Sequence, residues 1–185
     1  VHNPVSEADL SPAAPARARL AYDELLANQL ALTLVRRAAS ESMPGRNFAG
    51  DGRLTAALAK SLPFSLTGAQ VRAIDEIRQN QQAPRRMLRM LQGDVGSGKT
   101  LVALLAMLHA NEAGAQAALL APTEVLARQH HATINKFLTP LGIKAKLLLG
   151  RGRSGSAARK QIIAGLADGS VQMVVGTHAL LSDNV

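Results

Sequence analysis

The sequence lacks cysteine and tryptophan and contains no long apolar run. Without cysteine there is no disulfide framework, no thiolate zinc site and no cysteine nucleophile, which fits a reducing compartment. The longest apolar run, Leu101–Leu108, has eight residues, whereas a membrane helix needs roughly 18–20. The first residues also lack the basic-then-apolar plan of a secretory signal. We therefore expect a cytoplasmic protein that does not associate with a membrane.

Aromatic and acidic residues are scarce as well. The four aromatic residues are Tyr22, Phe48, Phe64 and Phe137, fewer than is usual in proteins that stack single-stranded bases. Lysine and arginine number 21 against 13 acidic residues, so the net charge is +8 and the isoelectric point is near 10.8. This balance predicts a polyanionic partner, by default a nucleic acid contacted mainly through its phosphates.

The N-terminal third predicts an appendage to a larger domain. Residues 1–12 are polar and broken by prolines, which is typical of a loose leader. Residues 13–39 carry leucines near helical spacing and predict one long amphipathic linking helix. Residues 40–63 contain Pro44, Gly45 and further glycines, and we expect a linker there.

After Pro63 helical and strand patterns alternate. Helices are predicted at 68–81, 99–111, 123–138 and 156–167, and strands at 87–92, 116–121, 144–149 and 171–176. Four strands separated by helices indicate an α/β fold with a mostly parallel sheet covered on both faces. No internal repeat is visible.

One glycine-rich stretch matches a phosphate-binding loop at every fixed position. It reads Gly93-Asp94-Val95-Gly96-Ser97-Gly98-Lys99-Thr100, the pattern G-x-x-x-x-G-K-[ST]. Glycines allow backbone N–H groups to approach phosphate oxygens, and a helix that begins at the loop adds its positive dipole end. In such a loop Lys99 supplies a cation for the β- and γ-phosphates, and the Thr100 hydroxyl binds Mg²⁺.

Chance does not explain this match. At this composition about 0.004 accidental matches are expected in the whole sequence. The context also fits, because an apolar run of strand length precedes the loop and an apolar helix follows it. The alternative interpretation, a glycine-rich turn with an incidental lysine, is therefore much less well supported than a phosphate-binding loop.

A second glycine pattern, Gly150 to Gly155, reads G-x-G-x-x-G between a predicted strand and helix. Dinucleotide binding would require an acid at the end of the next strand, and Val171–Val175 contains none. Arg151 and Arg153 suit a phosphate backbone better than a ribose hydroxyl. On the residues alone, a solvated basic loop and a DNA-contact loop remain equally open.

No acid occurs between Glu124 and Asp168, although that stretch is rich in cations. They are Arg128, Lys136, Lys144, Lys146, Arg151, Arg153, Arg159 and Lys160. A charge run is usually a solvated face, but eight unbalanced cations favour a polyanion track. His130 and His131 are adjacent and point about 100° apart on a helix, so packing is a better interpretation than metal binding. Taken singly, Gln70, Thr123 and His178 each fit a structural role as well as a functional one.

Together these segments resemble the first motor domain of a superfamily 2 helicase, and most closely its RecG type. The resemblance covers about residue 17 onward. It rests on Phe64–Gln70, on Leu91–Thr100, on Ala121–Ala127 and on Gly176–Leu180, which are similar to the family's adenine-reading segment, motif I, motif Ia and motif Ib. The helix around Leu25–Leu30 is similar to the segment that joins the family's DNA-binding wedge domain to the motor.

The resemblance implies a RecA-like P-loop fold, ATP and Mg²⁺ as cofactors, and branched or forked DNA as partner of a monomer. It implies nucleotide binding by Phe64, Gln70, Gly93, Asp94, Val95, Gly96, Ser97, Gly98, Lys99 and Thr100, with Lys99 and Thr100 as catalytic residues. It implies DNA-backbone contacts by Pro122, Thr123, Glu124, Arg128, Gly150, Arg151, Arg153, Arg159, Gly176, Thr177 and His178. Residues 64–185 would form the N-terminal part of the motor domain.

Some of the family's motifs are missing from these 185 residues. The acidic DExH motif, which supplies a Mg²⁺ carboxylate and positions water, does not occur before Val185, nor does the second motor domain with its arginine finger. An arginine finger can be worth about 10³–10⁵ in rate, so we expect negligible hydrolysis by these residues alone. We also expect residues 87–92 to lack strand partners and the isolated chain to be marginally stable.

Three alternatives remain open at the level of sequence. The transcription-repair coupling translocase shares the Gly-Asp-Val-Gly-x-Gly-Lys-Thr spelling, but Leu66–Gln70 fits the RecG type better. A small-molecule P-loop kinase would explain the loop but not the basic stretch. A non-catalytic remnant could bind only DNA or a partner.

Overall fold

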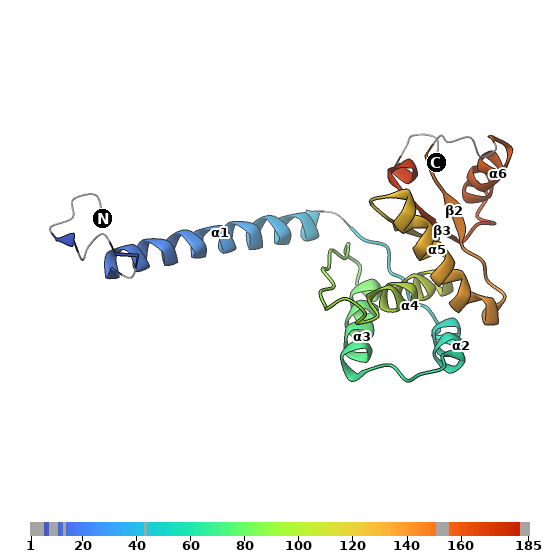
Figure 1. The fold of residues 1–185 in the computed structure, drawn as a ribbon, viewed down its shortest axis with the longest axis horizontal. Helices are drawn as coiled ribbons and strands as arrows, with labels where there is room; N and C mark the ends of the chain where they lie inside the picture. Colours follow the sequence, from blue (N-terminus) through green and yellow to red (C-terminus); the bar gives the residue numbers. More distant parts are fainter. Residues whose placement is uncertain (1–5, 8–10, 13, 43, 151–155, 182–185) are drawn as a thin grey trace. The chain divides into compact units, whose positions relative to one another are not determined.

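The computed structural model describes residues 6–7, 11–12, 14–42, 44–150 and 156–181. The chain divides into two compact units, residues 1–44 and 45–185. The first unit is dominated by one long helix, α1 (Pro15–Ser42), which confirms the helix predicted there (Figure 1). Its leucines are exposed, among them Leu25 at 65%. Arg19 and Asp23 form an ion pair along the helix at 3.0 Å.

The second unit begins with three helices and continues as an alternation of strands and helices (Figure 1). The helices are α2 (Arg53–Ser61), α3 (Gly68–Gln82), α4 (Lys99–Glu112), α5 (Glu124–Leu138) and α6 (Ser156–Ala167). The strands are β1 (Ala117–Leu120), β2 (Lys146–Leu148) and β3 (Met173–Gly176), and short 3₁₀ turns cover Thr139–Leu141 and His178–Leu181. Apart from α2, each of these helices and strands was expected from the sequence pattern within about three residues.

The three strands form one parallel sheet in the order β1-β3-β2. Leu120 of β1 and Leu148 of β2 both pair in register with Gly176 of β3. A Cβ at Gly176 would overlap the carbonyl oxygen of Leu148, so only glycine fits where these strands come together. The carboxyl ends of all three strands therefore lie level at one edge of the sheet.

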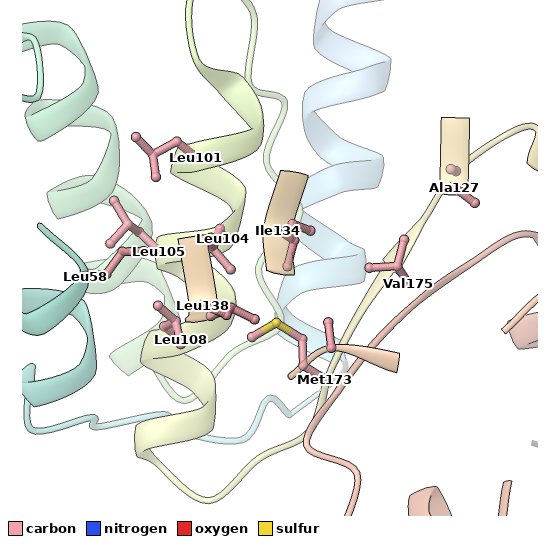
Figure 2. Close-up of a cluster of buried hydrophobic side chains, with 12 residues drawn as sticks. Leu58, Leu101, Leu104, Leu105, Leu108, Ala127, Ile134, Leu138, Met173 and Val175 are labelled. Carbon is pink, nitrogen blue, oxygen red and sulfur yellow. The ribbon is translucent and has the colours of Figure 1, made fainter. Parts of the chain in front are cut away.

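The core joins helices to one face of this sheet. Leu104 and Leu108 of α4, Ile134 of α5 and Met173 of β3 are all fully buried in one cluster (Figure 2). Val174 points to the opposite face of β3 because side chains alternate along a strand, and it is only 3% exposed. Both faces of the central strand are thus covered, as expected for a parallel sheet. The architecture is the α/β fold predicted from the sequence.

The prediction of a strand at residues 87–92 was wrong, whereas the expectation that this segment lacks strand partners is confirmed. None of the described residues forms a strand pair with this segment, and the side chains of Leu88 and Met90 are 89% and 87% exposed. A strand is stabilised by hydrogen bonds to a neighbour, and the three existing strands pair only with one another. One side chain of the segment, Arg89, forms an ion pair with Glu76 of α3 at 2.7 Å.

The expected linker, residues 40–63, also differs from the prediction because it contains helix α2. Leu58 of α2 is fully buried in the core cluster. The carboxylate of Glu112, at the end of α4, accepts hydrogen bonds from the backbone N–H groups of Gly52 and Thr55, both at 2.9 Å. This side chain has no exposed surface, and it satisfies donors at the start of α2 that have no partner within the helix. Segment 52–61 is therefore part of the second unit.

Among the helices that the structure describes, none has the length and apolarity required to cross a bilayer.

Candidate nucleotide and nucleic-acid sites

The glycine-rich loop leads directly into the N-terminus of α4. Gly96 and Gly98 have φ values of +83° and +81°, a left-handed conformation that side chains other than glycine rarely adopt. A Cβ at Gly98 would lie 2.5 Å from the amide nitrogen of Gln70, and a Cβ at Gly93 would lie 2.8 Å from the hydroxyl of Ser97. The loop is thus a tight backbone cradle whose shape depends on glycine at these positions.

Lys99, the first residue of α4, has its side chain folded back over the loop. Its Nζ donates hydrogen bonds to the carbonyl oxygens of Gly93 and Asp94, at 2.6 and 2.7 Å. A mobile cation is therefore positioned inside the cradle, next to a helix N-terminus that favours anions. These residues fit the triphosphate of a nucleotide in charge, in backbone shape and in helix polarity.

Gln70 connects helix α3 to the same loop. Its Oε1 accepts from the N–H of Thr67 while the Thr67 hydroxyl accepts from the N–H of Gln70, which completes a capping box. Its Nε2 donates to the carbonyl oxygen of Ser97 at 2.9 Å. One lone pair and one N–H of the amide remain for a ligand. The structure therefore brings the predicted adenine-reading glutamine and the phosphate loop together.

The other predicted nucleotide-site residues lie nearby along the chain. Thr100 occupies the second position of α4, Phe64 is 49% exposed, and Val95 is fully exposed at the tip of the loop. In the described ranges, no group of three or more histidine or acidic side chains is arranged to hold a metal ion. The Thr100 hydroxyl stays the predicted Mg²⁺ ligand.

The predicted nucleic-acid segments meet at the carboxyl edge of the sheet. Pro122–Glu124 follow β1, Thr177 and His178 follow β3, and Gly150 lies two residues beyond β2. The N–H of Ala121 donates to the carbonyl oxygen of Gly176 at 2.8 Å, which ties the first two segments together. Three stretches that are far apart in sequence thus line one edge.

The exposed residues on this edge come from the start of α5 and from the 3₁₀ turn that follows β3. Thr123 caps α5, because its hydroxyl accepts from the N–H of Leu126 at 3.3 Å. Glu124, Arg128 and His178 are exposed. A Cβ at Gly150 would lie 3.8 Å from Oε1 of Glu124, so the segments that follow β1 and β2 approach each other in front of β3.

Thr177 differs from these residues because it is only 2% exposed, and its hydroxyl has no hydrogen-bond partner among the described groups. Arg159 is half-buried, and its guanidinium donates to the carbonyl oxygen of Leu149 at 2.7 Å. Arg159 therefore anchors the exit of β2. The predicted contacts Arg151 and Arg153 lie outside the described residues.

Structural roles account for several other polar groups. His131 lies 3.1 Å from the carbonyl oxygen of Ala145 and 2.9 Å from the amide of Asn135, which fits the packing interpretation of this histidine. Hydrogen bonds from the side chain and backbone of Ser170 lower the pKa of Asp168, in the turn before β3. Sequence reasoning missed Glu112, because its partners are about 60 residues away and no local motif marks it.

The glycine cradle, its lysine and the parallel sheet define a RecA-like P-loop nucleotide-binding domain. The family model for the DEAD/DEAH box helicase matches residues 67–185. The chain belongs to the DEAD/DEAH box helicase family.

Curated relatives extend this similarity into the N-terminal unit. The chain is 44% identical over 171 residues to the ATP-dependent DNA helicase RecG of Escherichia coli K12, and 43% identical over 170 residues to that of Thermotoga maritima. The RecG of Mycobacterium tuberculosis H37Rv is 44% identical over 180 residues. Each alignment covers 92% of this chain but only 21–24% of the relative, so the chain spans about a quarter of their length.

Two solved helicase structures are also similar to this chain. A structure of RecG bound to a three-way DNA junction matches with a TM-score of 0.81 and 43% identity, over 90% of this chain and 22% of that one. The DUF1998 helicase MrfA matches with a TM-score of 0.51 and 25% identity, over 73% of this chain and 19% of that one.

Proposed function

We propose that the chain is the nucleotide-binding part of an ATP-dependent DNA helicase that acts on branched DNA in replication-fork rescue, recombination and repair. The observation that carries the proposal is the combination of two features in one domain. A glycine cradle with Lys99 lies at the start of α4, and three strand ends meet at one edge of the sheet. The RecG relatives support the same reaction and the same class of DNA.

For the nucleotide, we infer that Mg²⁺-ATP binds in the cradle. Lys99 contacts the phosphates, Thr100 binds the metal ion, and the backbone of Gly93–Gly98 encloses the phosphate chain. Phe64 and Gln70 contact the adenine. When bound, ATP supplies the phosphoryl-transfer free energy that drives movement along DNA. Residues 64–185 form the nucleotide-binding portion, and the protein acts as a cytoplasmic monomer.

For the DNA, we infer that the carboxyl edge of the sheet contacts the phosphate backbone. Exposed Arg128 and His178 lie there, and Pro122, Thr123 and Gly150 offer backbone groups close by. Thr177 and Gly176, at the end of the central strand, are buried, so we infer that they position the exposed His178 and do not themselves contact the DNA backbone. Among the residues that the structure describes on this edge, Glu124 is acidic, and we infer that it orients neighbouring groups. Arg151, Arg153 and Arg159 add cations next to Gly150.

The salt dependence of DNA binding tests this assignment. Fluorescence anisotropy with a labelled three-way junction would give the slope of log K against log salt concentration, which reports the number of phosphate contacts. Replacing Arg151 and Arg153 with alanine is expected to reduce the slope by about two units, and adding Arg159→Ala by up to one more. Arg53→Ala, on α2, is the charge-matched control for a single arginine and should leave the slope unchanged. An unchanged slope in the triple variant would contradict the proposal.

A further inference from the structure

The segment that precedes α2 packs against the end of α3. The N–H of Gly45 donates to the carbonyl oxygen of Pro84 at 3.2 Å, and the N–H of Phe48 donates to that of Gln81 at 2.9 Å. The first bond holds Gly45 against the residues that follow α3, and the second is accepted by the last turn of α3 itself. A Cβ at Gly45 would overlap the backbone of Arg85, so glycine permits this close approach.

The contact between Gly45 and Pro84 brings two arginines close together. Arg46 follows Gly45 and Arg85 follows Pro84 along the chain, so their backbones lie near each other at this contact. Both arginines are exposed. We call Arg46 and Arg85 the arginine pair.

Arg46 is held in place by an aromatic ring. Its guanidinium carbon lies 5.9 Å from the centroid of the Phe48 ring, within the range of a cation–π contact. Stacking restricts the side chain, while the donors at the rim of the planar guanidinium can still point outward. Such a fork matches a phosphate group in bidentate geometry. A stacked arginine is therefore better prepared for phosphate binding than a freely rotating lysine.

The positive charge of the arginine pair is not neutralised locally. Within the described ranges no carboxylate forms an ion pair with Arg46 or Arg85, whereas the nearby Arg89 is paired with Glu76 at 2.7 Å. Like charges that are held close together repel each other. A bound anion would remove this repulsion, so the pair favours an anionic ligand.

We propose that the arginine pair is a further phosphate-binding surface that takes the DNA backbone, in addition to the carboxyl edge of the sheet. The proposal rests on the proposed function, because it names a second contact for the same DNA. The arginine pair is separate from the phosphate cradle, because segment 87–92 lies between them along the chain. The cradle takes the phosphates of the nucleotide, so the arginine pair is left for the phosphates of DNA. Contact through phosphates makes this surface insensitive to base sequence.

The test is DNA binding by the whole chain carrying R46A and R85A together, measured by anisotropy over a range of salt concentrations. Each lost phosphate contact lowers the slope by roughly 0.9 on duplex DNA, so the expected loss is close to two units. The matched control, R53A with K60A, removes the same charge from the exposed surface of α2 and should leave the slope unchanged. R46K with R85K keeps both charges and should retain the slope while weakening binding several-fold.

The outcomes separate this inference from the proposed function. A wild-type slope in R46A/R85A, with a reduced slope after neutralising Arg151 and Arg153, would overturn the arginine pair alone. No salt-dependent DNA binding by the wild-type chain would overturn the proposed function and the arginine pair with it. If R53A/K60A lowered the slope of log K against log salt concentration as much as R46A/R85A does, the inference would also be overturned. Such a result would show that only the net charge of the chain matters. Circular dichroism of each variant checks that the exposed substitutions leave the fold intact.

Discussion

The side-chain amide of Gln70 donates a hydrogen bond to the carbonyl oxygen of Ser97, 2.9 Å away, and so connects the start of α3 to the phosphate loop. The same side chain completes the capping box with Thr67. Its remaining lone pair and N–H form an acceptor and a donor side by side. This arrangement is complementary to the N6 amino group and N7 of adenine.

Replacing Gln70 with alanine is therefore expected to have two effects. Loss of the capping box should lower the free energy of unfolding by about 1 kcal/mol. Loss of the amide should also reduce the preference for ATP over GTP, because the donor and acceptor pair that distinguishes the bases is gone. Thermal unfolding and competitive nucleotide titration measure the two effects. Gln79→Ala, in an exposed position of the same helix, should change neither, and an unaltered nucleotide preference in Gln70→Ala would contradict the assignment.

The buried carboxylate of Glu112 predicts a strong effect on stability far from the loop. Glu112→Ala would leave the N–H groups of Gly52 and Thr55 without an acceptor in a buried site. Unsatisfied buried groups and lost charged hydrogen bonds together cost about 2–4 kcal/mol. Urea unfolding measures the loss. Glu76→Gln removes the exposed pair with Arg89 and should cost less than about 1 kcal/mol, and equal losses in the two variants would show that the α2 contact is weak.

The sequence allowed prediction of those features that depend on local signals. The glycine loop and the periodic helices are both defined within a few residues. The meeting of Pro122, Gly150 and Thr177 at one edge is a finding of the structure, consistent with the rule that parallel strands end together. Their closeness depends on the strand order β1-β3-β2, which the sequence pattern does not specify.

Features that depend on distant partners escaped prediction. Helix α2 follows two glycines, Gly50 and Gly52, and so has the local pattern of a linker. Its stability comes from Glu112, about 60 residues away, and from burial of Leu58. Segment 87–92 has the apolar pattern of a strand, but a strand also requires a neighbouring strand to bond with, and among the described residues the sheet contains only β1, β3 and β2. In the same way, the closeness of Arg46 and Arg85 depends on a backbone contact between two segments that are distant in sequence, and no local pattern indicates it.

The exposed apolar side chains of segment 87–92 predict a surface that binds hydrophobic dyes. Leu88 and Met90 are almost fully exposed, so replacing both with serine removes exposed apolar area without opening a cavity. We expect L88S/M90S to reduce dye fluorescence and aggregation while the melting temperature stays within a few degrees of wild type. Leu104→Ser, in the core, should instead unfold the chain. A large loss of stability in L88S/M90S would show that the segment packs in solution.

Calorimetric titration of the chain with Mg²⁺-ATP, compared between wild type and Lys99→Ala, tests the central claim most directly. The Nζ of Lys99 lies inside the cradle, 2.6 Å from the carbonyl oxygen of Gly93, where a nucleotide phosphate would take over its hydrogen bonds. Removing this cation should abolish measurable binding, because the β- and γ-phosphate charges lose their main side-chain partner. Lys60→Ala, on α2, is the control and should bind as wild type does. Equal ATP affinity in wild type and Lys99→Ala would contradict the assignment of the loop and the function built on it.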